Sequence, residues 1–196
     1  MRKLLHMLLG VAVLALLLSG CAANLASKKR VDAKLAAGSR IAVLPFENLS
    51  GTDRAAEKVT ELFVVALTTE DRLETLQYGS VYEAMRRYRI RSASLLNDRQ
   101  IDSLAAFLRI DYLVSGSVLE FKAEDDVYLG TVPQVSFNTR VIDCRTHRTV
   151  WVGSANGRGD RGEVAFGIGA VRSVETLAAG MVRESADEIR NLFEEE

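Results

Sequence analysis

The sequence predicts a single α/β domain in which helices flank a mixed β-sheet of about five strands. In the first half of the chain, short apolar segments alternate with amphipathic helical segments, which is typical of parallel strands joined by helices. In the second half, three strand-like segments follow one another directly, which indicates antiparallel pairing. The chain of 196 residues is long enough to bury one hydrophobic core.

The first half contains, in order, an expected strand, helix, strand, helix and helix, at 40–44, 54–69, 72–76, 80–89 and 97–108. The apolar run that ends at Pro45 is typical of a buried strand. The first helical segment repeats apolar side chains at helical spacing, so one of its faces should pack against the sheet. Thr52 or Asp53 is its expected N-cap, while Gly79-Ser80 and Asn97-Asp98 should begin the other two helices.

The second half contains three expected strands and a C-terminal helix, at 112–121, 135–141, 149–155 and 171–193. In the middle strand, apolar and polar residues alternate, which predicts one buried side and one side that faces solvent. Residues 143–148 should form the hairpin turn between the last two strands, and residues 157–169 a glycine-rich, charged loop before the helix.

The N-terminus carries a targeting signal. Arg2 and Lys3 precede an apolar run at 4–18, and small residues then lead to a cysteine, which is the pattern of a secretory signal. The sequence Leu18-Ser19-Gly20-Cys21 resembles the lipobox of bacterial lipoproteins, in which the signal is cleaved before the cysteine and the cysteine receives acyl chains such as palmitate. The alternative is an ordinary secretory signal followed by a chance cysteine.

This signal divides the chain into a cleaved peptide at 1–20, a lipidated Cys21 with a tether at 21–38, and a domain at 39–196. The tether segment is small, polar and weakly patterned, with some helical character expected. Ala22 follows the cysteine where Asp commonly marks inner-membrane retention in Gram-negative lipoproteins. We therefore expect a lipid anchor in the outer membrane and a domain that faces the periplasm.

The sequence shows none of the motifs that carry catalysis, metal binding or cofactor binding. It contains no CxxC, HExxH or GxSxG pattern, and Gly167-Ile168-Gly169 lacks the spacing of a nucleotide-binding loop. His147 lies in the expected hairpin turn, where solvation is a simpler interpretation than catalysis. The formal net charge of −1 offers no strongly basic character for nucleic acid. We expect no enzyme activity, no cofactor, no metal and no nucleic-acid partner.

The two cysteines leave no intramolecular disulfide if Cys21 is lipidated. Cys144 follows an apolar strand, so a buried, unreactive thiol is the first interpretation, and a reactive thiol or an intermolecular bridge is the alternative. The acidic residues Asp125-Asp126 and Glu194 to Glu196 should be solvated.

A basic cluster at the end of the second predicted helix is the one candidate docking site. It consists of four arginines close to Tyr82 and Tyr88, namely Arg86, Arg87, Arg89 and Arg91. Such a patch could bind an acidic protein, anionic lipid or a cell-wall polymer. The alternative is a solvated helix end, because the helix dipole favours cations near the C-terminus.

Several segments together resemble the CsgG-like family of bacterial envelope lipoproteins, which includes the curli-secretion lipoprotein and is related in fold to the penicillin-binding-protein activator LpoB. The resemblance covers roughly 40–193 and rests on Ile41 to Phe46 with Asn48, on Asp111 to Val118, and on the hairpin from Arg140 to Trp151. It implies a fold like the anticodon-binding and TolB N-terminal domains. It also implies interaction work in the periplasm rather than catalysis.

The resemblance leaves two expected functions. The preferred one is a lipid-anchored, non-catalytic adaptor or regulator of an envelope assembly, such as a secretion apparatus or cell-wall synthesis. The alternative is an oligomeric subunit of an outer-membrane secretion channel. A homo-oligomer is compatible with either function. Pore formation is not expected, because the connection from Phe121 to Val135 and the loop at 157–169 are short and charged, whereas a membrane hairpin needs two strands of about 9–11 residues.

Overall fold

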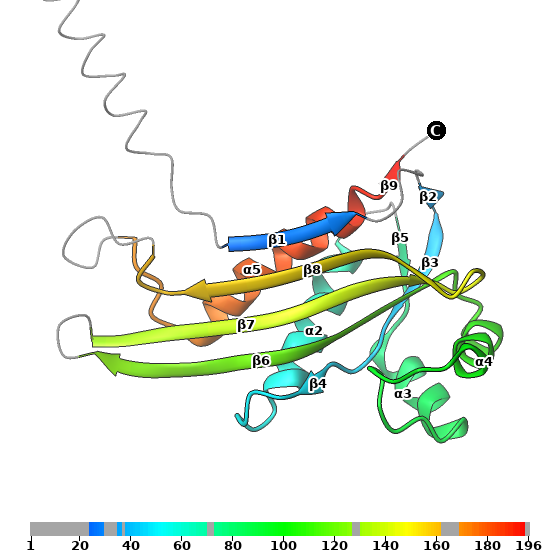
Figure 1. The fold of residues 1–196 in the computed structure, drawn as a ribbon, viewed down its shortest axis with the longest axis horizontal. Coiled ribbons are helices and arrows are strands. Elements are labelled where there is room, and N and C mark those ends of the chain that lie inside the picture. Colours follow the sequence, from blue (N-terminus) through cyan, green and yellow to red (C-terminus); the bar gives the residue numbers. More distant parts are fainter. Residues whose placement is uncertain are drawn as a thin grey trace, which may run out of the picture.

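The computed structural model describes residues 24–29, 35–36, 38–69, 73–126, 130–161 and 169–194. These residues form one α/β domain around a seven-stranded mixed sheet, so the predicted fold class is confirmed (Figure 1). The signal peptide at 1–20 and the predicted lipidation site Cys21 lie outside the described residues, as do 162–168 and 195–196.

The sheet has the strand order β1-β8-β7-β6-β3-β5, and β4 pairs beside β6 beyond the end of β3. Its strands are β1 (Asn24–Lys29), β3 (Ser39–Val43), β4 (Glu47–Asn48), β5 (Leu73–Thr75), β6 (Tyr112–Asp126), β7 (Gly130–Asp143) and β8 (Arg148–Arg158). The strands β3, β4, β5 and β6 pair in parallel, and β6, β7, β8 and β1 pair antiparallel. This agrees with the prediction for the two halves of the chain, although β1 and β4 were not predicted. A separate two-stranded sheet joins β2 (Leu35–Ala36) to β9 (Phe193–Glu194).

Four helices cover the sheet unequally. The helices α2 (Ala55–Thr68) and α5 (Val174–Arg190) lie behind the long strands in Figure 1, and α3 (Tyr78–Arg87) and α4 (Asp98–Leu108) gather at the end of the sheet where β6 begins. The first pair buries the larger core, centred on Phe63, Phe137 and Trp151. The second pair buries a smaller cluster on the opposite face, around Leu44 and Leu113. A large part of that opposite face therefore has no helix over it.

Two of the three predicted helix starts differ from the structure, and the third is confirmed. Neither Thr52 nor Asp53 caps α2, because Arg54 occupies the N-cap position in a left-handed conformation without a side-chain cap. Gly79-Ser80 does not begin α3, which starts two residues earlier at Tyr78. Asn97 does begin α4, and its side chain accepts a hydrogen bond from the Gln100 backbone N–H in a capping box.

Three strands extend beyond the predicted limits, and β8 runs to Arg158, so the first two residues of the predicted glycine-rich loop belong to the sheet. The segment between Phe121 and Val135 was predicted to be a connection, but it continues the β6–β7 ladder to the pair Asp126 and Gly130. A register shift between Val118 and Glu120 marks a bulge, which hides the strand periodicity in the sequence. The apparent connection is therefore a long hairpin with three residues outside the described part.

The sheet also reaches into the segment that the sequence assigned to the tether. Asn24–Lys29 forms β1 at the edge of the sheet and pairs antiparallel with β8 from Asn156 to Trp151. Some helical character was expected there, and these six residues are a strand instead. No helix among the described residues is long and apolar enough to cross a membrane.

Candidate binding sites on the open face and the α3–α4 corner

The strands β6, β7 and β8 present two very different faces, because side chains alternate along a strand. The face toward α2 and α5 holds large apolar side chains, with Phe137 and Trp151 almost completely buried. In the middle of these strands, most of the opposite positions carry small or polar side chains. We call this surface the open face, and its central members are Ser115, Ser117, Asn138, Arg140, Val152 and Ser154.

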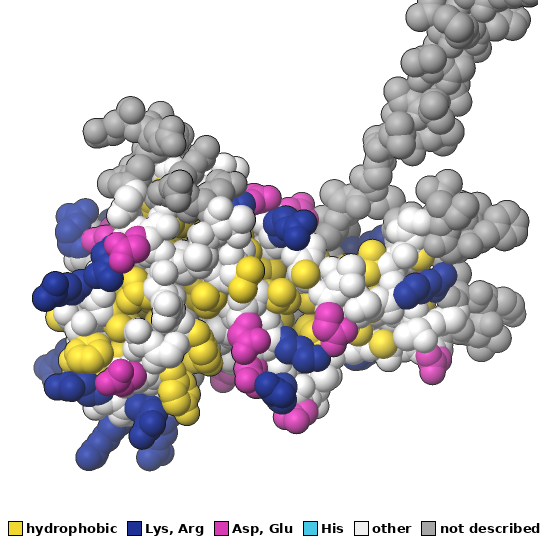
Figure 2. Space-filling view, turned by 180° about the vertical axis from the view of Figure 1, so that it is seen from behind, with side chains coloured by type: hydrophobic (Ala, Val, Ile, Leu, Met, Phe, Trp, Pro, Cys, Tyr) yellow, Lys and Arg dark blue, Asp and Glu magenta, His cyan; other side chains and the backbone are white. Residues whose placement is uncertain are grey.

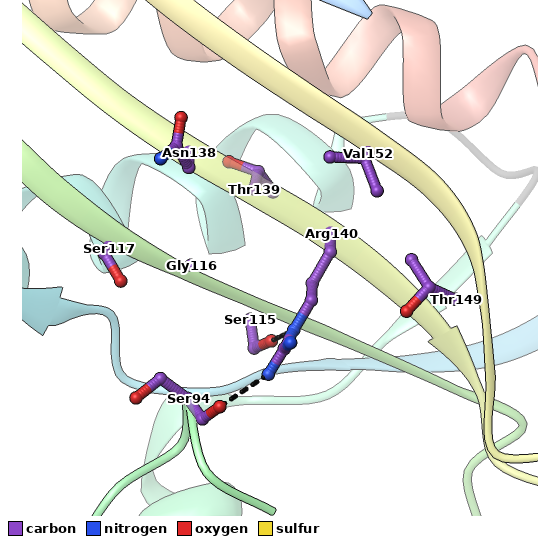
Figure 3. A pocket seen from close by; sticks show the side chains of 9 residues that line it. All are labelled: Ser94, Ser115, Gly116, Ser117, Asn138, Thr139, Arg140, Thr149 and Val152. Carbon is purple, nitrogen blue, oxygen red and sulfur yellow. Dashed lines mark hydrogen bonds between the residues drawn. The ribbon is translucent and has the colours of Figure 1, made fainter. Parts of the chain in front are cut away.

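A pocket of about 360 Å³ lies on the open face next to the segment that links α3 to α4. Its walls come from β6, β7 and β8, and Ser94 of the linking segment closes one side (Figure 3). Most of the lining residues are Ser, Thr or Asn, which offer hydroxyl and amide groups between apolar carbon atoms, and Val152 adds an apolar wall. This volume falls within the range of small-molecule sites, which hold a few well-placed polar groups.

Arg140 is the charged side chain of this pocket, and hydrogen bonds fix its position. Its Nε–H donates to the Ser115 hydroxyl at 2.9 Å, and its Nη2 donates to the backbone carbonyl of Ser94 at 2.8 Å. Figure 3 shows the side chain extended from β7 across β6 toward Ser94. Because Ser94 lies on the linking segment, Arg140 ties that segment to the sheet.

The Ser94 hydroxyl continues this network away from the sheet. It donates to a Glu47 carboxylate oxygen at 2.6 Å, and it also lies 2.9 Å from the Ser92 hydroxyl. The segment between α3 and α4 is thus held from both sides, by β4 through Glu47 and by β7 through Arg140. The sequence analysis missed Arg140 as a site residue, because a single arginine in an alternating strand looks like any solvent-facing position.

The four arginines of the predicted docking site are exposed at the end of α3 and just after it. Arg86 and Arg87 lie in the last turn of the helix, Arg89 follows in a left-handed conformation, and Arg91 begins the segment that leads to α4. Figure 2 shows Lys and Arg side chains gathered at the end of the molecule where α3 and α4 lie. The structure therefore exposes all four predicted residues, at the C-terminal end of α3 and in the residues that follow it.

Exposed aromatic side chains lie beside Arg86 and Arg87. The Arg87 guanidinium lies 5.1 Å from the centre of the Phe107 ring, and the Tyr88 ring meets the same ring edge-on at 6.0 Å. Tyr82 is 53% exposed and Leu95 is 79% exposed. We call this surface the α3–α4 corner, comprising Tyr82, Arg86, Arg87, Tyr88, Arg89, Arg91, Leu95 and Phe107. Phe107 and Leu95 were missed, because the sequence places them at unremarkable positions outside the arginine cluster.

The His147 side chain contacts two acidic side chains, whereas the sequence suggested that it is only solvated. Its Nε2 lies 2.7 Å from an Asp102 carboxylate oxygen, and its Nδ1 lies 3.6 Å from Asp98. Both acids belong to α4, so the imidazole joins the β7–β8 turn to that helix. The hydrogen bond with Asp102, with further attraction from the charges of Asp98 and Asp143, raises the pKa of His147 above its usual range.

The burial predicted for Cys144 is confirmed. The side chain is 5% exposed and packs in the smaller core with Leu113 and Ile142. Burial, aided by the charges of Asp143 and Asp111, raises the pKa of the thiol to about 12. Since the thiolate is the reactive form, this environment makes the thiol a poor nucleophile.

Within the described residues, no group of three His, Cys, Asp or Glu side chains is placed to hold a metal ion. Asp125 is exposed, as predicted, and accepts a hydrogen bond from the Thr131 hydroxyl. Glu120, Lys122 and Glu124 add a charged row to β6 beyond the pocket.

No protein-family model and no curated protein matches this sequence. Solved structures do match the fold. A PelC dodecamer from Paraburkholderia phytofirmans is 15% identical over 88% of this chain and 100% of that chain, with a TM-score of 0.58. Lipoprotein GNA1162 from Neisseria meningitidis is 20% identical over 78% of this chain and 99% of that chain, with a TM-score of 0.54.

The NMR structure of LpoB from Escherichia coli is 16% identical over 63% of this chain and 59% of that chain, with a TM-score of 0.50. At these identities the likenesses concern the fold. The domain therefore shares its fold with a lipoprotein of Neisseria meningitidis and with LpoB.

Proposed function

We propose that this protein is a lipid-anchored, non-catalytic adaptor that binds an acidic partner protein in a bacterial envelope assembly through the α3–α4 corner. The observation that carries the proposal is the composition of that corner. Four exposed arginines and exposed tyrosine, phenylalanine and leucine side chains belong to α3, α4 and the segment between them, and Arg87 packs on the Phe107 ring. Arginine and aromatic residues are enriched at protein interfaces and dominate their hot spots.

The remaining parts of the proposal follow from the sequence and the fold. The lipobox-like segment that ends at Cys21 supports a lipid anchor, and Ala22 supports the outer membrane with the domain in the periplasm. The fold shared with lipoprotein GNA1162 and with LpoB supports work in the envelope, in secretion or in cell-wall synthesis. The segments that resemble the CsgG-like family support membership of that family.

A capture experiment tests the docking surface. The full chain is used to capture partners from detergent-solubilised envelopes, in its natural form and with Arg86, Arg87, Arg89 and Arg91 changed to Gln. The matched control changes four other exposed arginines, Arg145, Arg148, Arg161 and Arg183, to Gln. We expect a captured envelope protein that the first variant loses and the control retains, and that is released as salt rises. Equal loss in both variants would show that total charge, and not this corner, is what matters.

The anchor is tested separately. Cys21→Ser removes the proposed lipidation site, and the protein should move from the membrane fraction to the soluble periplasmic fraction, because two or more acyl chains are what hold such a protein stably. Fractionation with palmitate labelling measures this. If the variant stays in the membrane fraction and the natural protein carries no palmitate, the lipid anchor is refuted. The docking proposal is not affected by that result, because the capture experiment tests it separately.

An oligomeric subunit of a CsgG-like secretion channel is the second candidate function. The observation that favours it is the fold shared with PelC, whose structure is a dodecamer. The long β6–β7 hairpin is the segment that would have to enter the membrane. Lys122 and Glu124 lie on one of its faces. The other face is apolar at Phe121 and Ala123 but reaches Asp125 two residues later, so its apolar stretch is shorter than the about 9–11 residues that a membrane strand needs.

We therefore expect the purified lipidated protein to leave planar bilayers without stepwise conductance, whatever its oligomeric state. Mass photometry in detergent gives that state independently. A deletion of the hairpin tip that includes Lys122, Glu124 and Asp125 provides the control. If the natural protein gives reproducible single-channel steps and the deletion variant does not, the secretion channel becomes the preferred function.

A further inference from the structure

Arg140 holds a half-buried positive charge with no negative partner among the described residues. Its two hydrogen bonds go to neutral oxygen atoms, those of Ser115 and Ser94. Glu47 is the carboxylate of the same network, but it accepts from the Ser94 hydroxyl and forms no ion pair with Arg140. A charge that is partly withdrawn from water is normally compensated by an opposite charge.

The geometry points to an oxyanion site in this pocket, in which Arg140 binds a carboxylate or phosphate group of a small polar ligand. A guanidinium presents its N–H donors in a planar fork that matches both groups. The two existing bonds occupy Nε and part of Nη2, so the donors of Nη1 remain for a ligand that enters the pocket. The hydroxyl of Ser117, the amide of Asn138 and the hydroxyl of Thr149 line the rest of the pocket and can bind hydroxyl groups of the ligand.

The Arg140 side chain is preorganised for anion binding. Ser115 and Ser94 hold the guanidinium flat across β6, so binding does not have to order a free side chain (Figure 3). Preorganisation of this kind raises affinity by removing that entropic cost. The site lies on the strands of the open face, and the arginines of the α3–α4 corner take no part in it, so it stands independently of the proposed docking function.

Isothermal titration calorimetry of the full chain in a non-ionic detergent tests the site with three probes at matched ionic strength. Glucuronate supplies a carboxylate on a hydroxylated ring, inorganic phosphate supplies the other oxyanion, and glucose is the neutral control. We expect saturable binding of glucuronate or phosphate and none of glucose. Binding of glucuronate alone would assign the site to carboxylate ligands, and binding of phosphate alone to phosphate ligands. Binding of neither anion, or equal binding of glucose, would overturn the proposal.

Variants then locate the binding. Arg140→Gln should weaken anion binding at least tenfold, while Arg183→Gln, an exposed arginine on α5, should leave it unchanged. Because Arg140 also ties the linking segment to the sheet, Asn138→Tyr provides a second test in which Arg140 stays in place and a larger side chain fills the pocket. It should also weaken binding at least tenfold. Unchanged affinity in a folded Asn138→Tyr protein would place the anion elsewhere and refute the site.

Discussion

The two faces of β6, β7 and β8 are built from alternate residues of the same strands, yet they do different work. On the covered face, Phe137 and Trp151 lie beneath α2 and α5 and form the centre of the main core. On the open face, Asn138 and Arg140 border a polar pocket. Adjacent residues of one strand therefore have different roles: those on the covered face stabilise the domain, and those on the open face are available to bind a ligand.

The sharpest test of this comparison pairs two adjacent residues. Phe137→Ala removes a buried ring that meets Phe63 edge-on at 5.6 Å, and it should lower the free energy of unfolding by about 3–5 kcal/mol. Asn138→Ala, on the open face, should change it by less than about 0.5 kcal/mol. Chemical denaturation of both variants measures the difference. Similar losses would mean that the open face is part of the core.

A second pair tests how tightly the covered face is packed. Gly116 points its missing side chain at the Phe46 ring and the Asn138 carbonyl oxygen, so the Cβ of Gly116→Ala would collide with both. Overpacking of this kind should cost about 1–3 kcal/mol. Ser117→Ala, the next residue on the open face, should again stay within about 0.5 kcal/mol. A neutral Gly116→Ala variant would show that Phe46 can move aside.

The small core beneath α3 and α4 should respond less strongly. Cys144→Ala removes one buried sulfur atom, and we expect a loss of about 1–2 kcal/mol in the free energy of unfolding. Because the thiol is buried and its pKa is raised, the natural protein should give no disulfide-linked dimer on non-reducing gels. A dimer that disappears in the variant would contradict the unreactive thiol.

The sequence predicted the order of the main elements, because hydrophobic periodicity is a local signal. It shortened β6 and β7, since the bulge near Val118 breaks the alternation and exposed charges such as Lys122 and Asp125 resemble a loop. It missed β1 for a different reason. Asn24–Lys29 has no strand pattern of its own, and its pairing with the edge of β8 is visible only in three dimensions.

The candidate sites divide in the same way. The arginines of the α3–α4 corner were predicted, because they lie close together in the sequence. Phe107 could not be added to them, since its contact with Arg87 depends on how α4 packs beside α3. The pocket was missed altogether, because Arg140 and Ser94 are distant in the sequence and meet only where the linking segment crosses the sheet.

The smallest expected effect on stability comes from His147, which lies in the turn between β7 and β8 next to α4. His147 joins the β7–β8 turn to Asp102 of α4, and its pKa is raised by that hydrogen bond and by the charges of Asp98 and Asp143. A group whose pKa is higher in the folded state stabilises the fold most at low pH. Its contribution is fully present below the unfolded value of about 6.5 and is lost as the pH rises through the raised folded value.

The measurement compares the natural protein with His147→Asn across that window. Asn tolerates the left-handed backbone at this position, where φ is 57°, and it does not titrate. Between about pH 6 and 8, where carboxylates stay ionised, the natural protein should lose more of its free energy of unfolding than the variant does. If the free energy of unfolding changes with pH in the same way in both proteins, the contact between His147 and Asp102 contributes no pH-dependent stability.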